Sequence, residues 1–177
     1  MKDEYGFTLI ELMTVVALVA IMAMIAFPAY SWLTTTNRLA SEINDFTTDV
    51  AYARSEAVKR GQTVTLCASN NQASCTNGPY TFGWIVFNDI NGNGTVDAGE
   101  KLLKVHSGLV HSGSTVGDTL TGTSSTIDDR ITYNNVGMTS NSGQVTLHSS
   151  PDKPSDRRCL TISTVGNYQL QRGSACP

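Results

Sequence analysis

Charged residues are missing from one long part of this chain: none occurs between Leu12 and Asn37. Charged side chains make up 15% of the 177 residues, and the formal net charge is −3. A mildly acidic chain has no global electrostatic attraction for nucleic acid, although its net charge does not exclude a local basic patch. The uncharged run therefore indicates a segment that avoids water.

Motifs for catalysis and for zinc binding are missing as well. The chain has no nucleophile motif, no phosphate-binding glycine loop and no Cys-x-x-Cys. Its three histidines, His106, His111 and His148, lack the spacing of metal ligands and are interpreted as structural. The sequence predicts neither an enzyme nor a cofactor-dependent protein.

Four cysteines are present, and they fall into two pairs that are local in sequence. Such an even set behind an apolar segment favours disulfides in an oxidising compartment. Four cysteines allow three connectivities. The pairing Cys67–Cys75 with Cys159–Cys176 is favoured, because each bond would close a short loop.

The uncharged run overlaps an apolar segment at 7–33, which is long enough for the ~20 residues that a membrane-spanning helix needs. Lys2 favours a cytoplasmic N-terminus. Pro28 removes a backbone donor, so a kink is predicted there.

Gly6 precedes the apolar core, and cleavage after it would leave the anchor on the mature protein. Glu11 lies near the helix start, where a carboxylate is costly and usually functional.

A second periodicity follows the apolar segment. Apolar residues recur at spacings of three and four from Leu39 to Ala57, which predicts that the same helix continues to Arg60 and stops at Gly61. The whole helix, from Phe7, would be about 80 Å long. Beyond it the apolar period changes to two. The expected strands are 63–68, 80–87, 101–106, 130–134, 144–149, 159–163 and 168–172, with 107–129 mostly loop and a further short strand within it. The fold class is α+β, one long helix packed on antiparallel β-structure.

The stretch from Gly6 to Glu11, Gly-Phe-Thr-Leu-Ile-Glu, resembles the cleavage and methylation motif of type IV pilins and type II secretion pseudopilins. The resemblance implies a pilin fold. It also implies that a prepilin peptidase of the bacterial inner membrane cuts after Gly6 and methylates the new amino group of Phe7. Residues 1–6 would be the leader, 7–33 the transmembrane and assembly half of the helix, and 34–177 the periplasmic domain.

Several later segments resemble the GspH/FimT/FimU group of that superfamily. The resemblance implies a minor, low-copy subunit that joins other minor pilins and the major subunit to prime or cap a filament. The late cysteine pair is more similar to pilus proteins of the FimU and FimT kind, and a GspH-type secretion pseudopilin is the alternative. The similar segments are AYARSEA (51–57), GWIVFND (83–89), NGNG (91–94), DAGE (97–100) and ITYN (131–134) with Gly137.

Glu11 admits two interpretations. Cleavage after Gly6 creates a cation at Phe7, and in a staggered helical bundle the Glu11 carboxylate of one subunit could meet the Phe7 ammonium of another. Alternatively, the carboxylate only reaches the membrane interface near the helix start. The flanking motif favours the assembly interpretation.

Residues 89–100 carry the spacing of an EF-hand calcium loop, with oxygen ligands at positions 1, 3, 5, 9 and 12 and glycine at position 6. The flanks are predicted strands, however, and Asn and Gly also suit a plain hairpin loop. The hairpin is the favoured interpretation and a weak calcium site the alternative. The ligands would be Asp89, Asn91, Asn93, Asp97 and Glu100.

DNA binding is a further alternative. In some FimT proteins a Gly-Arg-x-Arg sequence near the C-terminus binds DNA, but the matching place here begins at Gly166 and lacks both arginines. Phosphate contacts would need cations grouped on one face. Arg157, Arg158 and Arg172 are the candidates, and an ordinary solvated surface is the favoured interpretation.

Overall fold

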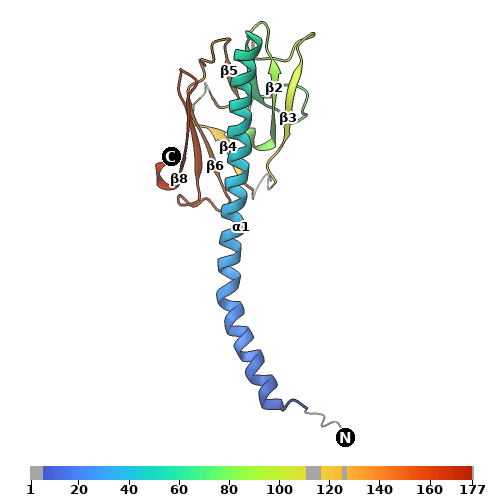
Figure 1. The fold of residues 1–177 in the computed structure, drawn as a ribbon, viewed down its shortest axis with the longest axis vertical. Coiled ribbons are helices and arrows are strands. Elements are labelled where there is room, and N and C mark those ends of the chain that lie inside the picture. Colours follow the sequence, from blue (N-terminus) through green and yellow to red (C-terminus); the bar gives the residue numbers. More distant parts are fainter. Residues whose placement is uncertain (1–5, 111–116, 125–126, 177) are drawn as a thin grey trace. The chain divides into compact units, whose positions relative to one another are not determined.

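A computed structural model of the chain describes residues 6–110, 117–124 and 127–176, apart from the side chains at positions 28 and 29. Within these ranges one long helix, α1, precedes eight strands and two short 3₁₀ helices (Figure 1). Contacts divide the chain into two units, one up to Asn37 and one from Arg38 onward. Helix α1 contributes to both units.

Helix α1 runs from Leu9 to Arg60 without interruption, as the two apolar periodicities predict. Gly61 ends it with a φ of +64°, a left-handed conformation that glycine adopts without steric cost. The amide of Gly61 donates to the carbonyl of Val58, and the amide of Gln62 to that of Ala57, which is a Schellman motif. The stop at Gly61 is thereby confirmed. The kink at Pro28 stays a prediction, because that side chain lies outside the described residues.

In the second unit, one stripe of α1 forms the centre of the core. Every apolar side chain of the predicted stripe is at most 1% exposed. Residues from both β-sheets join the same cluster, so the helix and the two sheets share one continuous core. The stripe consists of Leu39, Ile43, Phe46, Val50, Ala53 and Ala57.

The strands form two four-stranded antiparallel sheets, in the orders β3-β2-β1-β5 and β4-β6-β7-β8 (Figure 1). Strands β2 and β3 form the expected hairpin, and β4 is the short strand expected between 107 and 129. The α+β prediction is confirmed. The strands are β1 (Val64–Ala68), β2 (Gly83–Asn88), β3 (Leu102–Ser107), β4 (Thr119–Gly122), β5 (Arg130–Tyr133), β6 (Gly143–His148), β7 (Arg158–Ile162) and β8 (Tyr168–Arg172).

The expected strand at 80–87 is wrong in its first three residues. Tyr80–Phe82 form a 3₁₀ helix, and β2 begins only at Gly83. The backbone turns at Gly83, where φ is +125° and an added Cβ would lie 2.8 Å from the carbonyl oxygen of His106. The turn accompanies the burial of Tyr80, whose hydroxyl donates to the carbonyl of Ile127 at 2.9 Å. A period-two pattern carries no information about such a turn.

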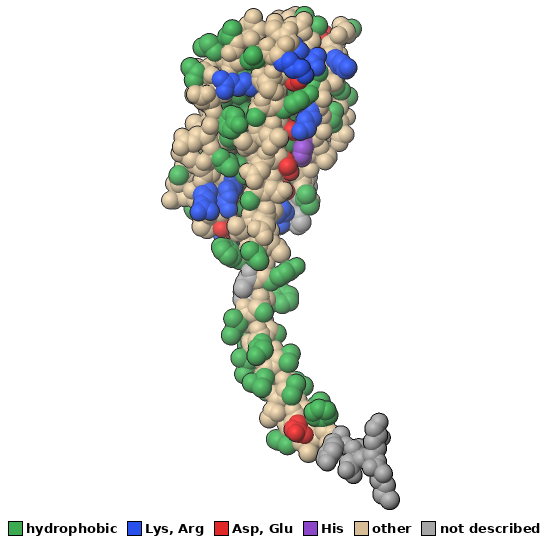
Figure 2. Space-filling model, in the orientation of Figure 1, with side chains coloured by type: hydrophobic (Ala, Val, Ile, Leu, Met, Phe, Trp, Pro, Cys, Tyr) green, Lys and Arg blue, Asp and Glu red, His purple; other side chains and the backbone are tan. Residues whose placement is uncertain are grey.

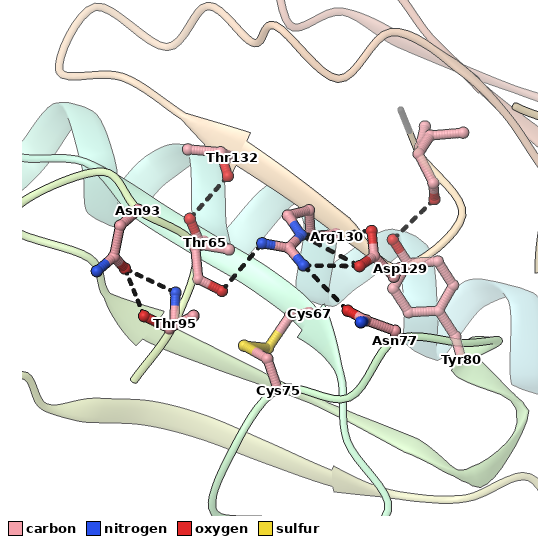
Figure 3. Close-up of polar contacts among 12 residues, drawn as sticks. Thr65, Cys67, Cys75, Asn77, Tyr80, Asn93, Thr95, Asp129, Arg130 and Thr132 are labelled. Atoms are coloured by element: carbon pink, nitrogen blue, oxygen red, sulfur yellow. Dashed lines mark hydrogen bonds and ion pairs between the residues drawn. A yellow bond between two sulfur atoms is a disulfide. The ribbon is translucent and has the colours of Figure 1, made fainter. Parts of the chain in front are cut away.

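Both disulfides join the pairs that the sequence favours, Cys67–Cys75 and Cys159–Cys176. Cys67 lies in β1, and Cys75 lies in the loop that follows (Figure 3). Successive strand residues face opposite sides of a sheet, so Cys67 points away from the main core. There it forms a second apolar cluster with Ile85 and Phe87, against which Val96 packs.

Candidate functional site

The first turn of α1 contains a capping box formed by Thr8 and Glu11. The Thr8 hydroxyl accepts from the Glu11 amide at 3.3 Å, and the Glu11 Oε2 accepts from the Thr8 amide at 2.9 Å. The Thr8 hydroxyl also donates to Oε2 at 2.9 Å. This reciprocal pairing satisfies amides that a helix start leaves without partners. It also explains why the helix begins at Leu9 rather than at Phe7.

The capping box could have been found in the sequence. Thr-x-x-Glu before an apolar run is its signature, and Thr8-Leu9-Ile10-Glu11 fits it. Glu11 therefore has a partner inside its own chain, which the sequence interpretation omitted. A role for Glu11 in assembly has to be separated by experiment from its role as a cap.

The rest of the first unit leaves its apolar surface uncovered. Every large hydrophobic side chain described between Phe7 and Leu33 is exposed, Phe7 itself to 90%. By length and composition, α1 is the one helix of the described chain that could cross a membrane. Figure 2 shows hydrophobic side chains along this part of α1, with an acidic side chain near its start. Such a surface needs lipid or other helices to cover it.

The 89–100 loop connects β2 to β3 and folds onto itself. Asp97 Oδ2 accepts from the side-chain amides of Asn91 and Asn93 at 2.8 and 2.7 Å. These two donors lower the pKa of Asp97. Glu100 returns to the loop start and accepts from the Ile90 amide at 2.8 Å. Across the described residues, no group of three or more His, Cys, Asp or Glu side chains is placed to hold a metal.

The three arginines considered for DNA binding do not form one exposed patch. Arg157 is paired with Asp152, its Nε lying 3.0 Å from Oδ1. Arg158 is only 8% exposed and donates to the carbonyls of Asp156 and Arg157. Arg158 and Arg172 are opposite each other in β7 and β8, and both line a cavity of about 330 Å³ beside α1. Arg157 is not among the residues that line it.

We therefore expect no DNA binding through these residues. In a gel-shift assay at low salt, the chain should leave a short duplex unshifted, because neutralising several phosphates needs several accessible cations on one face. A shift that disappears in a variant with Arg157, Arg158 and Arg172 all replaced by glutamine would contradict this expectation. A variant with Arg60 and Lys59 replaced provides the control for general charge.

Arg54 of α1 holds the turn at the place that matches the DNA-binding sequence. Its guanidinium donates to the carbonyls of Gly137 and Val165, at 3.0 and 3.1 Å. It also lies 3.4 Å from the Asn167 side-chain oxygen. The turn between β7 and β8 is thus anchored on α1 through hydrogen bonds, a structural arrangement that does not present cations to a ligand.

Three acidic side chains of α1 are buried, Glu42, Asp49 and Glu56. Asp49 is 1% exposed, accepts from the Trp84 indole N–H at 2.8 Å and forms an ion pair with Lys104. The ring of His106 stacks on Trp84 with centroids 4.0 Å apart, so this histidine is structural, as expected. Sequence spacing places Asp49 at the border of the core stripe but cannot reveal the indole opposite it.

Glu42 is another of these buried acids, 6% exposed. Its Oε1 accepts from the Val110 amide at 3.2 Å, whereas Oε2 has no hydrogen-bond partner. Burial, and next the negative charge of Asp118, raise the pKa of Glu42 to about 7. Arg38 opposes this shift but is itself paired with Asp118 at 2.7 Å.

Stability should consequently depend on pH through Glu42. Its pKa is higher in the folded chain than the ordinary value of 4.5, so its contribution is full below pH 4.5 and is lost as the pH rises through about 7. The free energy of unfolding of Glu42→Gln, relative to that of the wild type, should therefore increase from pH 5 to pH 8. The expected increase is on the order of 2 kcal/mol, since one pKa unit corresponds to about 1.4 kcal/mol. Unfolding of the full chain in detergent, followed by circular dichroism, measures this. The same pH dependence in wild type and Glu42→Gln would contradict it, and Asp45→Asn, an exposed position, is the control.

Comparison with known proteins identifies the class. Residues 42–166 match the family model of the type II transport protein GspH, and residues 1–27 match that of the prokaryotic N-terminal methylation motif. The type IV minor pilin FimU of Pseudomonas aeruginosa has a similar structure in two crystal forms. One, at 22% identity and a TM-score of 0.57, covers 80% of this chain and 93% of FimU. The other, also at 22% identity, has a TM-score of 0.52 and covers 78% and 94%. No curated protein sequence is significantly similar.

A methylation motif, an apolar helix and an α+β domain of two antiparallel sheets together define a type IV pilin-like protein. The family model covers most of the chain, and the protein therefore belongs to the GspH family. Members of this family are structural subunits and not enzymes. The absence of catalytic motifs in the sequence agrees with that assignment.

Proposed function

We propose that the protein is a minor type IV pilus subunit of the FimT/FimU kind. Prepilin peptidase would cut after Gly6 and methylate Phe7, leaving 7–33 as a single span of the inner membrane and 34–177 in the periplasm. The observation that carries the proposal is the first unit: a capped helix that begins within a methylation motif and leaves its described large apolar side chains uncovered.

Assembly would cover that surface with the helices of other subunits. Parallel helices of other minor pilins and of the major subunit offer apolar surface of the same kind, and lipid covers it before assembly. Glu11 is the one charged residue within this surface from Phe7 to Asn37. It would pair with the Phe7 ammonium of a neighbouring subunit and so set the register of the bundle, with the complex priming or capping the filament.

The late disulfide supports the pilus side of the family. Cys159 in β7 is bonded to Cys176, which ties the C-terminal tail to the second sheet. In the pilin resemblance, this late pair is more similar to FimU and FimT proteins than to secretion-side GspH. The alternative function is a GspH-type pseudopilin of the type II secretion system, and the description of the matching family model favours it.

Deletion of the gene in its own bacterium distinguishes the two functions. A pilus subunit should be needed for surface piliation and twitching motility while secreted enzymes still reach the medium. A pseudopilin should show the reverse pattern. Complementation with the wild-type gene controls for effects on neighbouring genes, and loss of export with normal twitching would overturn the pilus proposal.

A further inference from the structure

Two arginines of the second sheet face one cavity without a carboxylate beside them. Arg158 in β7 and Arg172 in β8 lie directly opposite each other, so their side chains are on the same face of the sheet. Both line the cavity of about 330 Å³ beside α1, and no acidic residue of the described chain lines it. Neither forms an ion pair with another described residue. Like charges placed opposite each other are destabilising, and an anion between them would remove that cost.

Both guanidinium groups keep donors for such an anion. Arg158 is 8% exposed, and its Nη1 donates to the carbonyls of Asp156 and Arg157. Its Nε and Nη2 groups have no partner within the described ranges. Arg172 is exposed, and its side chain makes no hydrogen bond to any part of the chain that the structure describes. A carboxylate accepts two parallel hydrogen bonds from a guanidinium, so it is the anion that fits these donors best.

The other walls of the cavity suit a side chain better than an inorganic anion. Apolar residues of α1 and β8 line it next to the arginines, and Leu170 keeps 42% of its surface exposed. A phosphate or sulfate ion gains nothing from apolar walls, whereas the carbon atoms of a peptide side chain do. The residues that complete the lining are Ala40, Ile43 and Leu170, with the polar Asn44 and Gln171.

Strand β8 is an open edge of its sheet, because only β7 lies next to it in the described chain (Figure 1). The amide of Gly173 donates to the carbonyl of Arg157, which fixes the alternation of hydrogen-bonded pairs along β7 and β8. The main-chain groups of Tyr168, Leu170 and Arg172 consequently point away from β7. Proline and bulges commonly protect an edge from pairing, and β8 has neither.

We propose that an extended segment of another protein pairs with the edge of β8 and places an acidic side chain against Arg158 and Arg172. Its main chain would bond to the outward-facing groups of β8, as peptides do when they add a strand to a sheet. A side chain two positions from the acidic one lies on the same face and would contact Leu170. DNA and lipid offer a phosphate to the arginines but no strand for the edge. The inference does not depend on the pilus proposal.

NMR titration of the isotope-labelled full chain in detergent tests the proposal. The probe is the peptide acetyl-TTVEVTT-amide at about 1 mM, a concentration that detects weak complexes. It should shift the main-chain amide signals of β8 and give NOE contacts to that strand. The uncharged peptide acetyl-TTVQVTT-amide should bind about tenfold more weakly, because it lacks the charge-assisted hydrogen bonds. Equal binding of the two peptides would overturn the proposal, as would shifts produced by inorganic phosphate or phosphatidylglycerol but not by the acidic peptide.

Two variants separate the arginines from the strand edge. Arg172→Gln should weaken binding of the acidic peptide about tenfold, whereas Lys101→Gln, at an exposed position just before β3, should leave it unchanged. Leu170→Pro removes an outward amide without removing a bond to β7, and it should abolish pairing. Leu170→Ala keeps that amide and should weaken binding only severalfold. Circular dichroism confirms folding, and wild-type affinity in folded Arg172→Gln or Leu170→Pro would overturn the proposal.

Discussion

Replacement of Glu11 by alanine should leave a processed, membrane-inserted protein that rarely enters the filament. Removing one partner of a buried ion pair typically costs about 3–5 kcal/mol, because the other charge stays buried without compensation. That cost corresponds to a decrease of at least a hundredfold in the equilibrium for incorporation. The amount of the protein in sheared filaments, relative to the amount in membranes, measures the effect. Normal incorporation of Glu11→Ala would exclude the assembly role.

The capping box requires a matched variant, because Glu11→Ala also removes the bonds to Thr8. Glu11→Gln keeps an oxygen for the Thr8 amide, since Gln serves in capping boxes as Glu does, but carries no charge. If Glu11 acts through its charge, Gln should fail in assembly as Ala does. If it acts only as a cap, Gln should behave as the wild type.

The size of the incorporation defect distinguishes the capping role of Glu11 from its charge-pairing role as well. Loss of a helix cap costs about 1 kcal/mol, well below the cost of breaking a buried pair. Thr8→Ala removes the capping hydroxyl and leaves the Glu11 charge in place. This variant should therefore reduce incorporation only severalfold. A defect as large as that of Glu11→Ala would mean that the helix start, and not the charge, controls assembly.

The parts of the fold that repeat with a regular period were predictable from the sequence. The core stripe of α1 follows from spacings of three and four, and all six of its residues are buried. The end of the helix follows from Gly61, which alone in that region tolerates the left-handed turn. The β2–β3 hairpin follows from two alternating runs around an Asn- and Gly-rich loop.

The parts that depend on distant partners were not predictable. Asp49 is buried because the Trp84 indole and Lys104 meet it from another element. Glu42 is buried beneath the Val110 segment, 68 positions away. A helical period places both residues near the stripe but states nothing about what lies opposite. The turn at Gly83 likewise results from contacts with β3 and with Ser69.

The residues of the candidate sites differ in how well the sequence predicts them. The order of Gly6, Phe7 and Glu11 is local, so a motif suffices to find it. The spacing of the 89–100 loop is local too, and it predicts five oxygen ligands, but across the described residues no group of three or more His, Cys, Asp or Glu is placed to hold a metal. The burial of Asp89 is not local, because its carboxylate accepts from the hydroxyl of Thr65 in β1, 24 positions away. Sequence proximity groups Arg157 with Arg158 and Arg172, whereas the structure places only Arg158 and Arg172 beside one cavity and pairs Arg157 with Asp152.

Replacement of Gly6 by leucine should block maturation altogether. In the structure, a Cβ at Gly6 would meet no atom within 4 Å, so the folded chain itself tolerates a side chain there. A defect would therefore arise in recognition by the peptidase, which by the pilin resemblance needs a small residue before the cut. Without cleavage, Phe7 has no free ammonium to offer a neighbouring Glu11, and filaments should contain essentially none of the protein.

Intact-mass measurement of the membrane fraction distinguishes the outcomes. Gly6→Leu should retain the first six residues and lack the methyl group on Phe7, while Gly6→Ala, a small replacement, should still be cut in part. The uncleaved protein should remain inserted, because the apolar segment from Leu9 onward is intact. Mature, methylated protein from Gly6→Leu would show that the cut does not follow position 6. The pairing of Phe7 with Glu11 would then lose its cation.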